Sequence, residues 1–516
     1  MEINRNITMN QVTWFVVMLL GFLLAVFMGS AVGSADLGSV SIVLGAGIGI
    51  ATFLILGKNY WLLIPFSLGA SLPAVPLGGR SLELPELAIA GCSLFFLLRL
   101  ATRKEKLNFF RLINIPILLF MAWVGMVFVL NPVGLAAIGS QIGGGRFYLK
   151  IALAFAAYLI LSNREYSEKD LRWVFGLIIF GACFTLIYGV VSYLLVGPAI
   201  NLSTGIVDEE YYTWHQLLAV PATTVSFIIF ARWSPKQVFS IQKILTALIY
   251  ITCLLLVLIS GKRMALITIF LAPLISAILS RQISFIFIGL VFATLTLGIL
   301  TAGHGQLFSL PLVAQRTISF LPGDWDPEMD QLRGGADEWR AELRQWAGTM
   351  IKRDPLIGAG FAVNIQETAT ADTMAQKGGT IDIQVARYAL GRSWHNRWLG
   401  YAADFGIPMS IIQVIIYAWV LFLSYRVFKL DSGRSVLSVF GAYLIIYTLS
   451  DLAASWTSGH TALDAFSRWW IYGIIVALFV QSTKKARKPW EDKGSVESPS
   501  KRLSPSLARP GLGHAV

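Results

Sequence analysis

EWRAELRQWAGTMIKRDPLIGAGF (Glu338–Phe361) and GRSWHNRWLGYAADFGIP (Gly391–Pro408) belong to the one long polar segment that interrupts the apolar runs of this sequence. Runs long enough to cross a membrane lie on both sides of it. Polar side chains that could do chemistry are therefore concentrated in this segment. We expect a reactive site where the segment folds back onto the ends of the spanning helices.

The composition predicts an all-α polytopic membrane protein. Of the 516 residues, 56% are hydrophobic and 14% are charged, which lies outside the range of soluble domains. Helices of about 17 to 25 apolar residues satisfy their own backbone across a hydrocarbon core of about 30 Å. We predict about 12–14 transmembrane helices and one large external loop that contains an amphipathic helix. The apolar runs lie near residues 12–34, 39–57, 60–79, 84–101, 109–130, 147–162, 171–196, 214–231, 242–260, 264–281, 284–301, 400–428, 434–451 and 466–482.

Basic residues set the predicted orientation. Much of the net charge of +12 lies in three short connections, near residues 99–111, 232–243 and 426–434, and in the tail from Lys484. Cytoplasmic loops of membrane proteins carry such an excess of Lys and Arg, so this pattern argues against nucleic-acid binding. Both termini are then cytoplasmic, and the long polar segment lies outside, in the periplasm of a cell with two membranes.

Four regions follow from these patterns. Residues 1–301 form an N-terminal membrane region of about 11 helices, and residues 302–399 form the large periplasmic loop. Residues 400–483 add about three more transmembrane helices. Residues 484–516 form a basic cytoplasmic tail that is compositionally disordered. The run that begins at Val12 is too long for a signal-peptide core, so we expect it to be retained as a helix.

The loop is expected to fold around an amphipathic helix. Residues 336–351 have helical spacing, with Trp339, Leu343, Trp346 and Met350 on one face. Asp354 precedes a proline, and this position is disfavoured in a helix, so the helix should end there. We expect this helix to lie on the membrane surface or across the bundle.

Basic residues at two places are candidates for binding an anion. Lys262 and Arg263 lie in a tight turn on the predicted outer side, where short loops are normally poor in basic residues. An ordinary cytoplasmic hairpin, with one helix miscounted, is the alternative. Arg340 and Arg344 lie one turn apart on the loop helix, and a solvated, salt-bridged face is the alternative there. An arginine fork suits the two oxygens of a phosphate.

His395 is the candidate for proton transfer. A histidine at a membrane boundary can be a general base, a phosphate contact or an interfacial residue. Asn396 follows it, and Trp394 and Trp398 on either side would also fit an interfacial aromatic belt.

Neither a metal nor another cofactor is predicted. Asp324, Asp326, Glu328 and Asp330 alternate as in a calcium loop, but Pro327 interrupts them and Met329 stands where that loop needs glycine. A solvated acidic face is the better interpretation. Gly143–Arg146 could cradle a phosphate, with a flexible loop as the default interpretation. The cysteines, Cys92, Cys183 and Cys253, lie in separate apolar runs and do not resemble a metal-ligand set.

The order of three motifs resembles the O-antigen ligase-like family of bacterial membrane glycosyltransferases. Arg263 lies in the sequence SGKRMALITIF, and 14 residues separate Arg340 from PLIGAG at Pro355–Gly360. The pattern His395-Asn396-x-x-Leu399 follows, with Gly406-Ile407 beyond it. The resemblance covers roughly residues 245–430.

The resemblance implies roles for individual residues. Arg263 and Arg340 would bind the diphosphate of an undecaprenyl-diphosphate-linked glycan, and His395 would act on the acceptor or help to hold the leaving group. The family often has an acidic residue near the outer end of the penultimate span, and Asp451 matches it. Arg344 stands where a Trp usually follows the loop arginine, which leaves the choice between Arg340 and Arg344 open. Further candidate substrate contacts are Lys262, Arg344, Asn396 and Asp451.

We therefore expect a metal-independent glycosyltransferase of the bacterial inner membrane. It would ligate or polymerise surface polysaccharide, with lipid A-core or a growing glycan as the acceptor. A protein O-oligosaccharyltransferase of the same family is an alternative. A lipid-linked glycan flippase or other transporter is the alternative from another class, but it would need charged or broken-helix sites near the bilayer midplane, and the midplane segments are almost uncharged.

Overall fold

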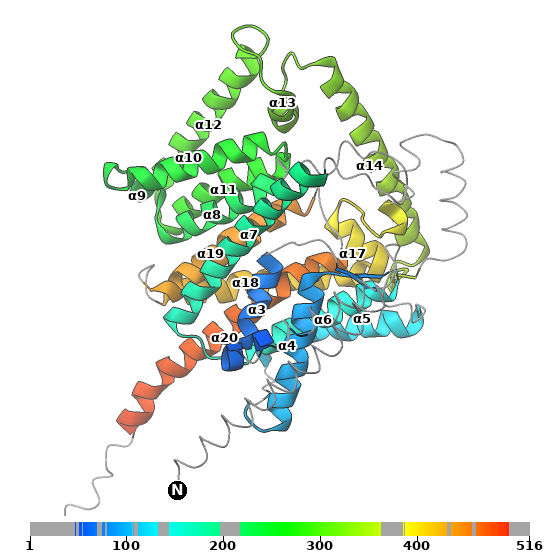
Figure 1. The fold of residues 1–516 in the computed structure, drawn as a ribbon, viewed down its shortest axis with the longest axis vertical. Helices are drawn as coiled ribbons and strands as arrows, with labels where there is room; N and C mark the ends of the chain where they lie inside the picture. The colour runs from blue at the N-terminus through cyan, green and yellow to red at the C-terminus, as the bar shows by residue number, and fades with distance from the viewer. Residues whose placement is uncertain are drawn as a thin grey trace, which may run out of the picture.

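The computed structural model describes most of the chain as helix (Figure 1). The described residues are 47, 51–53, 55–69, 75–77, 80–105, 107, 112–132, 144–196, 217–362, 385, 388–430, 435–456 and 461–494. The predicted runs at 12–34 and most of 39–57 lie outside them.

Nine described helices are long and apolar enough to cross a membrane, which confirms an all-α polytopic membrane protein. Two shorter apolar helices accompany them. The total of about 12–14 spans stays a prediction. The nine are α4 (Leu84–Ala101), α5 (Ile115–Leu130, entered through η2, Leu112–Asn114), α6 (Gly145–Ser162), α7 (Glu168–Val196), α10 (Ile244–Ile259, entered through η4, Ile241–Lys243), α12 (Ile283–Gly303), α18 (Ile407–Lys429), α19 (Val436–Ala454) and α20 (Thr461–Gly494). The shorter two are α8 (Ala219–Arg232) and α11 (Arg263–Leu279), and the four-residue α9 (Pro235–Val238) follows α8.

The prediction of one span over residues 60–79 is wrong. Helical turns η1 (Gly57–Leu62) and α3 (Leu63–Gly69) are followed by a short antiparallel hairpin of β1 (Val75–Leu77) and β2 (Arg80–Leu82), in which Val75 pairs with Leu82. Prolines and paired glycines in this stretch disfavour a continuous helix.

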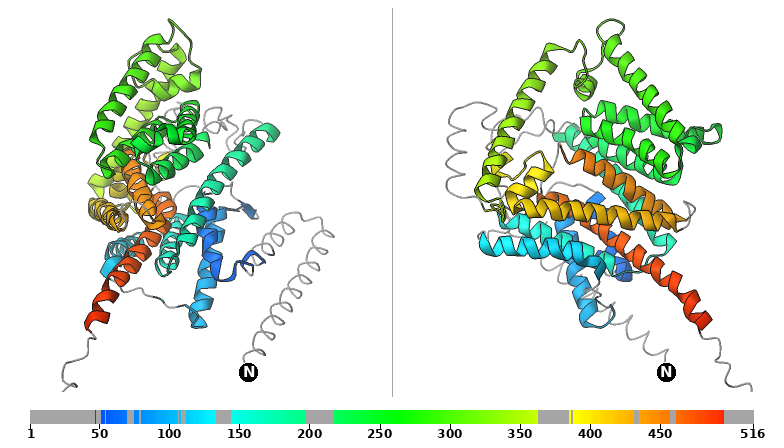
Figure 2. Two further views of the ribbon diagram at one scale, coloured as in Figure 1. Left: turned by 90° about the vertical axis from the view of Figure 1, so that its left-hand side faces the viewer. Right: turned by 180° about the vertical axis from the view of Figure 1, so that it is seen from behind.

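The helices differ in how deeply they are buried in the bundle. In the apolar 18-residue stretch of α20, 78% of the residues are buried inside the protein. In the corresponding stretch of α12, the buried share is 0%. Helix α20 packs on α6 so closely that a Cβ at Gly473 would lie 2.6 Å from the Tyr158 carbonyl oxygen. By contrast, α12 lies at the margin of the bundle in every view (Figure 2), and its exposed Leu290 and Phe292 side chains suit contact with lipid.

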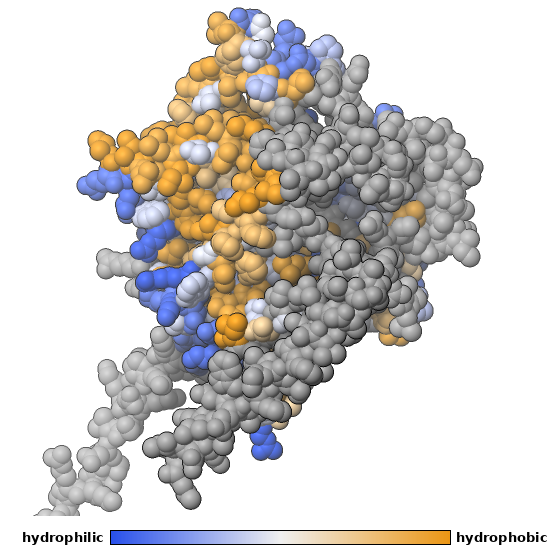
Figure 3. Space-filling view, in the orientation of Figure 1, coloured by the Kyte–Doolittle hydropathy of each residue, from blue (hydrophilic) through white to orange (hydrophobic). Residues whose placement is uncertain are grey.

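The face of the bundle at α10 and α11 is apolar, as contact with lipid requires. Figure 3 shows apolar side chains covering the area where α10 and α11 lie in Figure 1, with hydrophilic side chains at its margin. Leu245 and Leu255, both on α10, are more than half exposed. An apolar surface of this size would aggregate in water, so it is expected to face the membrane.

The predicted span at 400–428 is divided in the structure. Helix α17 (Arg397–Phe405) ends at Gly406, and α18 begins directly after it. Gly406 has φ +81° and ψ 165°, a conformation that is open essentially to glycine alone. A single helix was predicted because the composition stays apolar through the break, and the backbone angle at one glycine leaves no trace in hydropathy.

The amphipathic helix of the loop is longer than predicted. Residues 336–351 are the second half of α14 (Pro327–Arg353), which begins with Pro327 in its first turn and ends just before Asp354, as expected. Trp339, Leu343 and Met350 are buried, as the helical spacing predicted, and Trp346 is partly buried against them. A seven-residue helix, α13 (Leu312–Ile318), precedes α14.

The last helix extends into the segment predicted to be a disordered tail. Helix α20 continues to Gly494, because the sequence after residue 483 contains Lys, Arg and Ala, which favour helix. The remainder of that tail lies outside the described residues.

Candidate functional site

His395 and Arg340 meet at one indole ring. The His395 ring lies edge-on against Trp339 and Tyr388, with centroid distances of 4.9 and 4.7 Å. Trp339 and Tyr388 stack on each other at 5.0 Å. The guanidinium carbon of Arg340 lies 5.1 Å from the centroid of the Trp339 ring. Two candidate residues that are 55 positions apart (395 − 340) thus both contact the Trp339 ring.

The backbone at His395 adopts an unfavourable conformation. Its φ is +47°, and that of Arg392 is +54°; both lie in the left-handed region, which is uncommon for residues other than glycine. Such residues cost on the order of 1–3 kcal/mol each and persist where the surrounding structure fixes them. Buried Trp394 provides part of that support, because its Nε1 donates to Asp404 Oδ1 at 3.0 Å.

Asn396 has a structural role at the start of α17. Its side-chain oxygen accepts a hydrogen bond from the Leu399 amide at 3.1 Å, which is the usual arrangement of an N-cap. The pattern His395-Asn396-x-x-Leu399 is therefore, in part, the beginning of a helix. A contact between Asn396 and substrate stays a prediction.

Helix α14 covers α17 through a small apolar core of its own. Buried residues from both helices and from the chain between them form this core: Trp339, Leu343, Ala347, Met350, Ala359, Val385, Ala389, Trp394 and Ala403. This core fixes the register of α14, so that Arg340 is half-buried beside Trp339 while Arg344 is exposed. The geometry therefore favours Arg340 over Arg344 as the residue beside His395.

The motif Pro355–Gly360 attaches the loop to the helix break. Its amides at Ala359 and Gly360 donate to the carbonyl oxygens of Ala403 and Asp404 at 3.0 and 2.7 Å. At Gly358, with φ +74°, a Cβ would lie 2.5 Å from the Gly406 nitrogen. Glycine is therefore required where two stretches of backbone touch.

Arg263 faces a different neighbour. It is the first residue of α11, and its Nη2 donates to Ser319 Oγ, just after α13, at 2.9 Å. Thr317 of α13 donates to the Leu258 carbonyl oxygen at 3.1 Å, so α13 rests on the turn between α10 and α11. Lys262 in that turn is exposed. Convergence of Arg263 with Arg340 and His395 stays a prediction.

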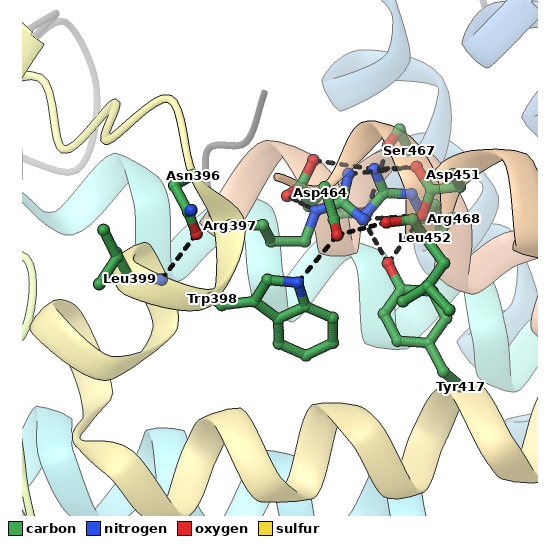
Figure 4. Close-up of polar contacts among 11 residues, drawn as sticks. Asn396, Arg397, Trp398, Leu399, Tyr417, Asp451, Leu452, Asp464, Ser467 and Arg468 are labelled. Atoms are coloured by element: carbon green, nitrogen blue, oxygen red, sulfur yellow. Dashed lines mark hydrogen bonds and ion pairs between the residues drawn. The ribbon is translucent and has the colours of Figure 1, made fainter. Parts of the chain in front are cut away.

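Asp451 lies in a buried charge cluster, defined here as Arg397, Asp451, Asp464 and Arg468 (Figure 4). Arg397 reaches Asp451 through two nitrogens, at 2.8 and 3.1 Å, and Asp464 through its Nε at 2.5 Å. Arg468 reaches the same two carboxylates at 2.7 and 3.0 Å. Tyr417 donates to Asp451 Oδ2 at 2.7 Å and also accepts from Arg397.

The hydrogen bonds and ion pairs of the cluster stabilise its charged groups. Both oxygens of Asp451 are engaged, Oδ1 with the two arginines and Oδ2 with Arg397 and Tyr417. Burial and the charge of Arg468 lower the pKa of Arg397, but the Asp464 and Asp451 carboxylates outweigh them and raise that pKa above its ordinary value. Arg397 is therefore charged at neutral pH.

Hydropathy alone did not identify Arg397, Asp464 or Arg468. The available signal was the presence of ionisable side chains at the edges of predicted spans, with Asp464 and Arg468 one helical turn apart. Such residues in membrane segments usually face the bundle interior and pair with one another.

A second group of paired charges joins α4 to α6. Arg146 lies 3.1 Å from Glu86, and Lys150 lies 2.7 Å from Glu83. Arg146, the last residue of the glycine-rich motif, is thus buried against carboxylates, which would oppose its binding to a phosphate.

Asp326, in the acidic run at the start of α14, also has a structural role. Gln315 donates to Asp326 Oδ2 at 2.5 Å and accepts from the Asp326 amide at 3.2 Å. The side chains of Glu328 and Asp330 lie outside the described residues. Within the part of the chain that the structure describes, no group of three or more His, Cys, Asp or Glu residues could hold a metal ion. Metal independence stays a prediction.

A family model described as O-antigen ligase matches residues 248–414. The match begins in α10 and ends in α18, and it includes Arg263, Arg340 and His395 but not Asp451. No curated protein matches the chain. This match supports an O-antigen ligase-like family for this multi-pass membrane protein.

Proposed function

We propose that the protein transfers glycan from an undecaprenyl-diphosphate-linked donor to lipid A-core or to a growing glycan, at the outer face of the bacterial inner membrane. The observation that carries this proposal is the meeting of Arg340 and His395 at the Trp339 ring, inside the domain that matches the O-antigen ligase model. One residue offers a fixed positive charge, and the other can accept a proton at neutral pH.

The reaction requires stabilisation of a leaving group. An acceptor oxygen attacks C1 of the donor sugar, the bond from C1 to the diphosphate oxygen breaks, and its electron pair stays on undecaprenyl diphosphate. Negative charge therefore grows on the diphosphate in the transition state, where fixed positive groups contribute most. Arg340 and Arg263 would supply that charge through their planar forks.

His395 would take the proton of the attacking hydroxyl group. General-base catalysis of this kind contributes on the order of a hundredfold or more. The edge-on packing of its ring against Trp339 and Tyr388 restricts the orientation of the imidazole. A fixed orientation favours catalysis because the base need not be ordered during the reaction.

Ligase and polymerase are preferred over protein glycosylation because no part of the loop sequence suggests a peptide-binding domain. Gel patterns of lipopolysaccharide or capsule from a deletion strain would separate the two. Loss of attachment with normal lipid-linked chains indicates a ligase, whereas single-repeat products indicate a polymerase. Normal gel patterns in that strain would contradict the proposal.

The proposed roles are tested with membranes that contain equal amounts of protein. His395→Ala should lose transfer while retaining bound donor lipid, because the base acts after the donor has bound. Arg340→Ala should lose donor binding as well. Full transfer activity in the His395→Ala variant would refute the assignment of the base.

A further inference from the structure

The charge cluster lies immediately next to the candidate base in sequence and joins three helices. Arg397, two residues after His395, is the first residue of α17. Asp451 comes from the last turn of α19, and Asp464 and Arg468 come from the first two turns of α20. We propose that Arg397 is a positioning residue, which fixes the start of α17, and therefore the backbone of His395, against α19 and α20. The inference rests on the proposed function for the role of His395.

The contacts of α17 with α19 surround Arg397. Its side chain is 1% exposed and binds Asp451 through both terminal nitrogens. Its amide donates to the Ser455 carbonyl oxygen at 2.9 Å, and Trp398 Nε1 donates to Ser455 Oγ, also at 2.9 Å. Side chain and backbone thus attach the same turn of α17 to the end of α19.

The strained backbone explains why such an attachment is needed. A residue with φ +47° relaxes unless its neighbours prevent it. On one side of His395, Trp394 is fixed by Asp404. On the other side the chain is fixed by Arg397, and loss of that contact would free one end of the strained segment. A shift of about 1 Å in a catalytic group can cost a hundredfold in rate.

The charge balance of the cluster determines which variants can test the positioning role of Arg397. The cluster contains two arginines and two aspartates, so removing one charge leaves a buried charge without compensation, which is strongly destabilising. A single variant could therefore misfold for reasons unrelated to positioning. Two double variants avoid this problem because each removes one positive and one negative charge.

The test variant is Arg397→Met with Asp464→Asn, and the matched control is Arg468→Met with Asp464→Asn. Both leave one arginine paired with Asp451, but only the control keeps the arginine that belongs to α17. We expect kcat of the test variant to fall on the order of tenfold to a hundredfold, with the KM for donor within about twofold of wild type. The control should keep most of its kcat.

A second readout does not depend on the reaction. His395→Cys is placed in each double variant, in a background in which Cys92, Cys183 and Cys253 are replaced, and its rate of maleimide labelling is measured. Labelling should be several-fold faster with the test pair than with the control pair, because the segment has lost one support.

The outcomes separate the two hypotheses. Equal labelling and equal kcat in the two double variants would overturn the positioning role, whatever His395 does. A fully active His395→Ala would instead overturn the proposed function, and the labelling rates would still decide whether Arg397 fixes this segment.

Discussion

Replacing Gly406 by alanine should destabilise the protein and its candidate site together. A Cβ at this position would lie 2.0 Å from the Leu356 carbonyl oxygen and 2.9 Å from the Ile357 nitrogen. Both are backbone atoms, so a side-chain rotation cannot relieve the clash. The φ of +81° with ψ 165° is also unfavourable for any residue with a Cβ, at about 1–3 kcal/mol.

The clash adds to this strain. To make room, the loop must move away from α18, and the hydrogen bond from the Ile407 amide to the Pro355 carbonyl oxygen at 2.8 Å would break. A lost backbone hydrogen bond costs about 0.5–1.5 kcal/mol. Together the two effects predict a destabilisation of about 1.5–4.5 kcal/mol.

The assay is thermal unfolding of the detergent-solubilised protein, followed by fluorescence-detected size exclusion. Gly348→Ala in α14 is the matched control, because nothing lies within 4 Å of the Cβ that it would add and alanine favours helix. Gly406→Ala should lose several degrees of thermal stability and most transfer activity, whereas Gly348→Ala should lose neither. Equal thermal stability of Gly406→Ala and wild type would refute the close approach of loop and helix break.

Four further outcomes follow from the site. Arg263→Lys should be nearly as inactive as Arg263→Ala in a transfer assay, since lysine keeps the charge but loses the fork; wild-type activity would exclude bidentate binding. Arg344→Ala should be milder than Arg340→Ala, because Arg344 is exposed; the reverse order would show that Arg344 binds the donor. Transfer should continue in excess EDTA, and activity restored by Mg²⁺ after chelation would show that a metal supplies the charge. A single cysteine at Ala375 should react with an impermeant maleimide in cells with a permeabilised outer membrane, and one at Ser498 should not; the opposite pattern would reverse the orientation.

Some features could be predicted because they are repeated along the sequence. Apolar runs predicted the helices, and helical spacing predicted the buried face of α14 at Trp339, Leu343 and Met350. Each prediction used many residues with a common period, so one residue that departs from the pattern did not change the predicted element. The end of α14 before Asp354 followed from a local steric rule at Pro355.

Other features could not be predicted because they depend on one residue or one distant contact. The break at Gly406 arises where the loop backbone crosses the chain, and sequence alone does not show which segments cross. The pairing of Arg397 with Asp464 joins residues 67 positions apart. Even the motif Pro355–Gly360, quoted for its resemblance to a family, attaches the loop to the helix break, a role that the sequence alone did not indicate.

The position of the break also bears on the choice between an enzyme and a carrier. Carriers place broken helices and charged groups near the bilayer midplane. Here α18 begins directly after Gly406 and has 23 residues, so at about 1.5 Å per residue it can cross a hydrocarbon core of about 30 Å without α17. The break therefore belongs at the membrane edge. Asp451 in the last turn of α19 and Asp464 in the first turn of α20 place the charge cluster at that same edge. A charged group at one surface, whose Arg397 lies two residues after His395, supports transfer chemistry at that surface better than alternating access through the bundle.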